Sequence, residues 1–180
     1  MRQIEELYKE IVKTNQHWAI DRPSVFNLAI SSLVLASYKV LKPVLAEDQW
    51  RNVIRYALIE RTQEKQRFFM RLFLKLDPNP FARIVKISKT KQIKHYGENQ
   101  FTHEIVVDTE KKYVLRVHKC FYHNFFREHD AGELTVIFCR LDNIWGDLLK
   151  PGNPHGVHFE RPAMLSTGQP ACSFEFEKLK

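Results

Sequence analysis

The spacing of apolar residues changes near the middle of the chain, and this change constrains the fold more than any other feature. In residues 1–97 apolar side chains recur at intervals of three and four, as in Ile4, Leu7 and Ile11, which is the period of an α-helix. In residues 98–180 two pairs of segments alternate between apolar and polar, which is typical of β-strands. The sequence therefore predicts a single α+β domain, with a helical first part and a small antiparallel sheet in the second.

The helical part divides at clear stop signals. Asp21-Arg-Pro-Ser24 predicts the end of a first helix and the N-cap of the next. Residues 24–45 are apolar nearly all round, so we expect a helix surrounded by others. A third helix, from about residue 50, ends before Asp77-Pro-Asn-Pro80. The most apolar run, Val25 to Tyr38, is about 14 residues, shorter than the roughly 20 that a membrane span needs.

The net charge of +7 is concentrated in one stretch. Five cations follow one another there with no acidic residue between them: Arg83, Lys86, Lys89, Lys91 and Lys94. We expect a short helix with a solvated basic face that ends near Gly97. The aromatic and glycine patterns of nucleic-acid-binding modules do not accompany it, so no nucleic-acid partner is predicted.

The cysteines indicate the compartment. The chain has three, Cys120, Cys139 and Cys172, and an odd, widely spaced set does not build the disulfide framework of a secreted protein. The first residues, MRQIEELYKEI, are charged from the start and do not resemble a signal peptide. We therefore expect reduced thiols in a cytoplasmic protein without a membrane span.

The second part is predicted to hold two hairpins with a helix inserted between them. Thr102 to Asp108 and Tyr113 to Cys120 alternate and are joined by a short polar turn. Residues 131–149 return to helical spacing. Gly156 to Leu165 and Ala171 to Glu177 then form the second hairpin around a glycine-containing turn.

A possible metal motif lies at the end of the first hairpin. Alternation along the strand places His118 and Cys120 on the same, more polar face. With His123 they read H-x-C-x-x-H, and zinc can take such ligands. The spacing is not that of a zinc finger, so we predict no metal and keep a metal-dependent enzyme as an alternative. The following residues, 121–130, are expected to be a connecting segment.

The inserted helix carries three candidates for chemistry. At about 100° per residue, Cys139 and Asp142 share a polar face at the border of the apolar stripe. That face could line a pocket, or Cys139 could be a small buried residue. Glu133 also has two interpretations: a general base, or the far member of a capping box that begins at Asp130.

The last hairpin places an arginine on an apolar face. Arg161 alternates in phase with Val157 and Phe159, so it points toward the core and needs a carboxylate partner or an anionic ligand. Cys172 lies on the inward face of the returning strand. A thiol near a guanidinium is a better nucleophile, which makes Cys172 a second candidate.

Two segments carry a family resemblance. "KCFYHNFFREHDAGELTVIFCRLD" and "FERPAMLSTGQPACSFEF" resemble the L-2-amino-thiazoline-4-carboxylic acid hydrolase family over residues 95–178. Ser173 departs from the acidic residue that often follows the last cysteine in this family. The positions that match the family pattern are Cys120, Glu133, Leu134, Cys139, Asp142, Arg161, Gly168, Cys172 and Phe174.

The resemblance implies a hydrolase that opens a C–N bond in a small cyclic amidine-like substrate carrying a carboxylate, without a cofactor. We assign Cys139 as nucleophile, Asp142 and Glu133 as acid/base or orienting groups, and Arg161 as the clamp for the carboxylate. The remaining candidates for the substrate pocket are Cys172, Cys120, His118 and His123. The main alternative is a non-catalytic small-molecule-binding domain similar to the 4-vinyl reductase type.

Overall fold

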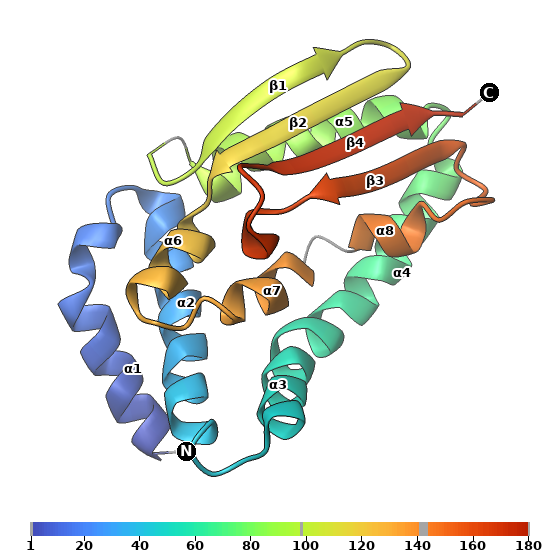
Figure 1. Cartoon of the computed structure of the whole chain (residues 1–180). Helices are drawn as coiled ribbons and strands as arrows, with labels where there is room; N and C mark the ends of the chain where they lie inside the picture. The colour runs from blue at the N-terminus through green and yellow to red at the C-terminus, as the bar shows by residue number, and fades with distance from the viewer. Residues whose placement is uncertain (1, 98, 141–143, 180) are drawn as a thin grey trace.

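The chain folds into a four-stranded antiparallel sheet with helices packed against one face, as the computed structural model shows (Figure 1). The structure describes residues 2–97, 99–140 and 144–179. The helical first part and the later sheet confirm the predicted α+β class. The helices are α1 (Arg2–Thr14), η1 (Gln16–Trp18), α2 (Arg22–Leu41), α3 (Glu47–Arg55), η2 (Tyr56–Glu60), α4 (Arg61–Leu76), α5 (Pro80–Lys91), η3 (Gln92–Tyr96), α6 (Phe121–Glu128), α7 (Leu134–Cys139), α8 (Ile144–Leu148) and η5 (Leu165–Thr167).

The start of α2 is set by the capping signal seen in the sequence. The Ser24 N–H donates to Asp21 Oδ1 at 2.7 Å, and the Asp21 N–H donates to Ser24 Oγ at 2.8 Å. These reciprocal bonds satisfy two donors that a helix N-terminus leaves open. By length and apolar composition alone α2 could cross a membrane, and half of its most apolar stretch is buried here. Leu28, Leu35 and Ala36 are almost wholly buried, as expected of a core helix.

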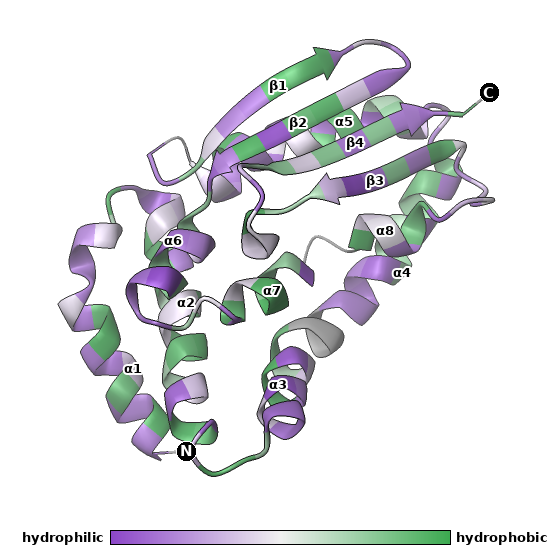
Figure 2. Cartoon of the chain, in the orientation of Figure 1, coloured by the Kyte–Doolittle hydropathy of each residue, from purple (hydrophilic) through white to green (hydrophobic). Residues whose placement is uncertain are grey.

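The third predicted helix begins at Glu47, slightly before the expected residue 50. It comprises α3, the π-helical turn η2 and α4, which lie end to end in Figure 1. Asp77-Pro-Asn-Pro80 ends it as predicted, and Asn79 Oδ1 then accepts the Ala82 N–H at 3.2 Å and caps α5. By contrast with α2, α1 alternates between hydrophobic and hydrophilic residues along its length (Figure 2), because only one of its faces is packed.

The sheet has the order β1-β2-β4-β3. Its inner face is built from alternate residues, so Leu115 pairs with Phe174 and Val117 pairs with Cys172. Both predicted hairpins are present, and their inward faces are the ones that alternation predicted. The strands are β1 (Thr102–Asp108), β2 (Lys112–Lys119), β3 (Val157–Ala163) and β4 (Cys172–Lys178).

A β-bulge in β3 sets the position of Arg161. Phe159 pairs with Phe176, an odd position with an even one as expected, but Ala163 pairs with Ser173. The register shifts between these pairs, so β3 carries an extra residue around Arg161. The bulge brings the arginine to the end of the inner face, next to the turn that leads into β4.

Two expectations for the middle of the second part were incomplete. The expected connecting segment contains α6, whose Phe121, Phe125 and Phe126 are fully buried. The predicted helix of residues 131–149 contains α7 and α8, and residues 141–143 lie outside the described part of the chain.

The capping box predicted at Asp130 is wrong. Asp130 has a left-handed backbone, with φ of 53°, and its N–H closes the end of α6 by donating to the Arg127 carbonyl. The N-cap position of α7 is Glu133 itself, and its side chain makes no capping bond. Glu133 points instead toward α2 and α3, where its carboxylate pairs with Lys42 and Arg51.

Candidate functional site

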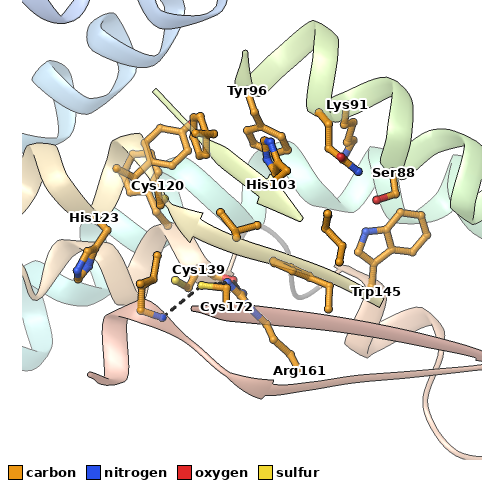
Figure 3. Close-up of a pocket in the computed structure, with 18 of the residues that line it drawn as sticks. Ser88, Lys91, Tyr96, His103, Cys120, His123, Cys139, Trp145, Arg161 and Cys172 are labelled. Carbon is orange, nitrogen blue, oxygen red and sulfur yellow. Dashed lines mark hydrogen bonds between the residues drawn. The ribbon is translucent and has the colours of Figure 1, made fainter. Parts of the chain in front are cut away.

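A cavity of about 140 Å³ lies between the inner face of the sheet and the surrounding helices (Figure 3). All four strands contribute lining residues, and the others come from α5, η3, α6, α7, α8 and η5 and from the segments next to them. An apolar cavity of about 150 Å³ takes a benzene-sized ring. The cavity therefore fits a small cyclic molecule.

All three cysteines line this cavity, although they come from separate elements. Cys120 follows β2, Cys139 ends α7 and Cys172 begins β4. None is in a disulfide. Burial is the main cause that raises the pKa of the Cys120 thiol to about 12, with smaller contributions from the neighbouring Cys139 and Cys172. Cys120 therefore stays protonated near neutral pH and is unsuited to nucleophilic attack.

Arg161 links the other two cysteines. Its Nη1 donates to the Cys139 carbonyl oxygen at 2.9 Å, and its Nη2 lies 3.6 Å from Cys172 Sγ. The guanidinium stacks over the Phe174 ring at 4.4 Å. The Leu165 N–H donates to the same Cys172 sulfur at 3.3 Å. Two donors thus converge on Cys172 Sγ, as Figure 3 shows for the arginine and cysteine side chains.

Cys139 contacts the turn between the last two strands. Its sulfur lies 3.4 Å from Ser166 Oγ, a contact in which either atom can donate. Ser166 belongs to the turn between β3 and β4, which closes the cavity on this side. The contact confirms that α7 meets the last hairpin at the cavity, which the sequence left open.

His123 is the histidine best placed to move a proton. It lines the cavity, and its Nδ1 is buried without a hydrogen-bond partner among the described residues. Burial, with a smaller contribution from the Arg127 charge, lowers the pKa of His123 below its ordinary value of 6.5. At neutral pH the ring is therefore uncharged and can accept a proton.

The wall formed by η3 and β1 is aromatic. His103 of β1 stacks on Phe101, with ring centroids 5.8 Å apart and planes 7° apart, and Tyr96 lies 5.9 Å from His103. All three line the cavity. Sequence reasoning missed them because each lies in a segment remote from the cysteines along the chain.

Lys91 was also missed. It belongs to the basic stretch that was expected to be solvated, yet it lines the cavity together with Ser88, one turn earlier on α5. Its neighbour Lys89 follows the expectation, since it pairs on the surface with Asp108 at 2.5 Å. No acidic side chain lines the cavity among the described residues. Lys91 and Arg161 therefore make the cavity attractive to an anion.

His118 does not reach the cavity, and the prediction that it shares a face with Cys120 is wrong. Thr102 pairs with Lys119 but His103 pairs with Val117, so His118 is the extra residue of a bulge. Its Nε2 lies 2.7 Å from Glu104 Oε2 in the exposed part of the sheet. The proposed H-x-C-x-x-H ligand set is therefore not assembled. Within residues 2–97, 99–140 and 144–179, no group of three or more His, Cys, Asp or Glu side chains could hold a metal ion.

Glu133 is likewise outside the cavity. Its carboxylate accepts a hydrogen bond from the Tyr38 hydroxyl, and Lys42 Nζ and Arg51 Nη2 lie 3.0 Å and 3.6 Å from it. Burial alone would raise the pKa of Glu133, but Tyr38, Lys42 and Arg51 together hold it below its ordinary value of 4.5. The residue ties α7 to α2 and α3. Asp142, its predicted partner in catalysis, lies outside the described residues.

The cysteines and Arg161 lie within a segment that matches a known family. The model of the L-2-amino-thiazoline-4-carboxylic acid hydrolase family matches residues 27–176. The chain belongs to this family. The match to the L-2-amino-thiazoline-4-carboxylic acid hydrolase family begins well before residue 95, the predicted start, and runs from within α2 into β4. The match includes every described residue that lines the cavity. No curated protein and no solved structure matches the chain.

Proposed function

We propose that this protein is a hydrolase that opens the C–N bond of a small cyclic amidine carrying a carboxylate, such as L-2-amino-thiazoline-4-carboxylate. The family supports hydrolysis. The observation that carries the proposal is the convergence of Arg161 and the Leu165 N–H on Cys172 Sγ at the wall of a ring-sized cavity.

The attack is assigned to Cys172 rather than to Cys139, the residue favoured by the sequence. A guanidinium and a backbone N–H donate toward the Cys172 sulfur, and these two contacts hold a potential nucleophile at the cavity wall. Arg161 contacts Cys139 through the backbone carbonyl oxygen, whereas it contacts Cys172 through the sulfur itself. Cys120 and Cys139 then act as wall residues.

The reaction is written in two steps. The Cys172 sulfur adds to the amidine carbon, and the ring C–N bond breaks as the ring nitrogen takes a proton. Water then adds to the same carbon and the sulfur leaves, which produces a carbonyl group and frees the thiol. His123 is the residue assigned to proton transfer, because its uncharged ring can accept a proton from the thiol or the water.

Arg161 and Lys91 both contribute positive charge to substrate binding. Arg161 orients Cys172 and contributes to holding the carboxylate, as the sequence suggested. Lys91 supplies a second positive charge from α5, with no ion pair of its own among the described residues. We place the enzyme in the cytoplasm, because three cysteines that line one cavity without forming a disulfide suit a reducing compartment.

Incubation of the purified protein with L-2-amino-thiazoline-4-carboxylate tests the proposal. We expect loss of the ring and appearance of an open-chain product, followed by chromatography and mass spectrometry. Calorimetry on the same sample separates the alternatives: tight binding without turnover supports the non-catalytic binding domain instead. If the protein neither binds nor turns over any cyclic amidine, the hydrolase and the binding domain are both contradicted.

A further inference from the structure

Helix α4 exposes an apolar face that no described part of the chain covers. Phe68, Phe69, Leu72, Phe73 and Leu76 are all exposed, by 65%, 65%, 47%, 52% and 74% of their surfaces. At about 100° per residue these five fall within an arc of about 140°. Isolated exposed apolar residues are common, but five on one face of one helix mark an interaction surface.

The opposite face of α4 attaches the helix to the fold. Leu74 is 1% exposed, and Arg67 pairs with Asp147 of α8 at 2.9 Å. Both lie on the side of the helix away from the exposed arc. The apolar face is therefore held outward by a packed helix, and none of its residues lines the cavity.

Cations accompany this apolar face. Arg71 and Lys75 are exposed on one flank of the arc, and Lys65 is exposed at its N-terminal end. Glu64 is the acidic residue nearest to them on α4. At the C-terminal end, the Arg83 guanidinium lies 5.2 Å above the Phe73 ring and pairs with Asp77. Phenylalanine and leucine beside lysine and arginine are typical of helices that lie in the interface of an anionic membrane.

A second copy of the chain fits this surface less well. Two α4 helices packed antiparallel about a two-fold axis would place the flank carrying Arg71 and Lys75 beside the same flank of the other copy. The net charge of +7 also opposes self-association. An anionic lipid surface supplies the opposite charge and an apolar layer at once.

From this apolar face and its cations we propose that α4 binds peripherally to anionic membranes. Phe68, Phe69, Leu72, Phe73 and Leu76 enter the boundary between headgroups and acyl chains, while Arg71 and Lys75 contact the headgroups. The helix lies in the plane of the membrane and the cavity stays in water. This inference is independent of the proposed reaction.

Co-sedimentation with vesicles tests the inference. The full-length protein is mixed with vesicles of phosphatidylcholine that contain phosphatidylserine, and with vesicles of phosphatidylcholine alone. We expect binding to the first and at least about tenfold weaker binding to the second. Raising the salt from about 0.1 M to about 1 M releases the protein, because the Debye length shortens from about 10 Å to about 3 Å.

Matched variants locate the contact. Phe69→Gln is expected to weaken vesicle binding about tenfold, because it removes one large apolar side chain from the buried face. Phe26→Gln on α2 is the control, since Phe26 is 66% exposed and lies on another helix; it leaves binding unchanged. Lys75→Gln weakens binding several-fold, whereas Lys13→Gln on α1 does not. Ring-opening activity, where present, is the same in all four variants.

Three results overturn the inference: no binding to vesicles containing phosphatidylserine, equal loss of binding in Phe69→Gln and Phe26→Gln, or a dimer in solution that Phe69→Gln dissociates. The last assigns the face to a second copy. Circular dichroism and thermal melts of each variant show whether the chain is folded, so that a folding defect is not taken for loss of a contact.

Discussion

Glu133 and Arg161 are both half-buried charged residues that the sequence picked out, but their surroundings differ. Glu133 meets two cations and a tyrosine from α2 and α3, so its charge is matched by the fold. Arg161 lies at the cavity wall and directs its donors to a carbonyl and a thiol. The comparison teaches that a charged residue in a family motif can join helices as readily as it can act in a site.

The largest expected effect comes from the thiol beside Arg161. Cys172→Ser lowers kcat/KM at least about 1000-fold, because a hydroxyl in that position is a far weaker nucleophile. Cys139→Ser, the matched control, lowers it only a few-fold. Steady-state kinetics of both variants decide the assignment. If Cys139→Ser is the inactive one and Cys172→Ser retains turnover, the nucleophile is Cys139.

His123→Gln is expected to lower kcat about 100-fold, the lower range for loss of a general acid or base. The wild-type rate falls as pH decreases through a value below 6.5, because the pKa of His123 is lowered by burial and protonation removes the base. His118→Asn, which changes an exposed histidine, leaves the profile intact. A His123→Gln variant that keeps the wild-type rate and the same fall in acid excludes His123 from proton transfer.

Arg161→Lys keeps the positive charge but loses the planar fork that reaches Cys139 and Cys172 together. We expect kcat/KM to fall about 30-fold and iodoacetamide to alkylate Cys172 more slowly, as measured by mass spectrometry. Lys91→Gln is the contrasting variant. It raises KM about tenfold and leaves alkylation of Cys172 unchanged, because Lys91 has no contact with the thiol among the described interactions. Equal alkylation in both variants contradicts the orienting role of Arg161.

The smallest effect on activity is expected for Glu133→Gln, which lowers the free energy of unfolding by about 1 kcal/mol. The folded state holds the pKa of Glu133 below 4.5, so its stabilisation is present above pH 4.5 and is lost as pH falls through the lower folded value. The difference between variant and wild type therefore narrows in acid. Urea unfolding at neutral and acidic pH measures it, with Glu128→Gln as an exposed control. If Glu133→Gln lowers kcat strongly without lowering the free energy of unfolding, Glu133 acts in catalysis and the structural role is contradicted.

Much of the fold could be predicted from local patterns. Alternation placed Arg161 and Cys172 on inward faces, and the signals at Asp21 and Asp77 marked helix boundaries. These features depend on neighbours within a few positions. The separation of Cys120 from His118 could not be predicted. A bulge adds one residue at the end of the strand, and His118 stays exposed beside Glu104 while Cys120 lines the cavity.

The composition of the site was less predictable. The partners of Glu133 are Lys42 and Arg51, more than 80 positions earlier in the chain, and tertiary packing alone brings them together. The position of Lys91 at the cavity was equally hard to predict, because nothing in a basic stretch of sequence distinguishes a lysine that faces a cavity from one that faces solvent. The sequence predicts a connection rather than a helix from Phe121 to Glu128, because eight residues give barely two turns of helical period.

The bulge that positions Arg161 also affects how the sheet meets other chains. β3 is an edge strand, and a free edge can pair with a strand of another molecule and start aggregation. Pro162, next to Arg161 in the bulge, has no N–H to offer an incoming strand. The irregular backbone around it also breaks the flat ladder that such pairing requires. The same short distortion therefore aims a guanidinium at a thiol and protects an otherwise open side of the sheet.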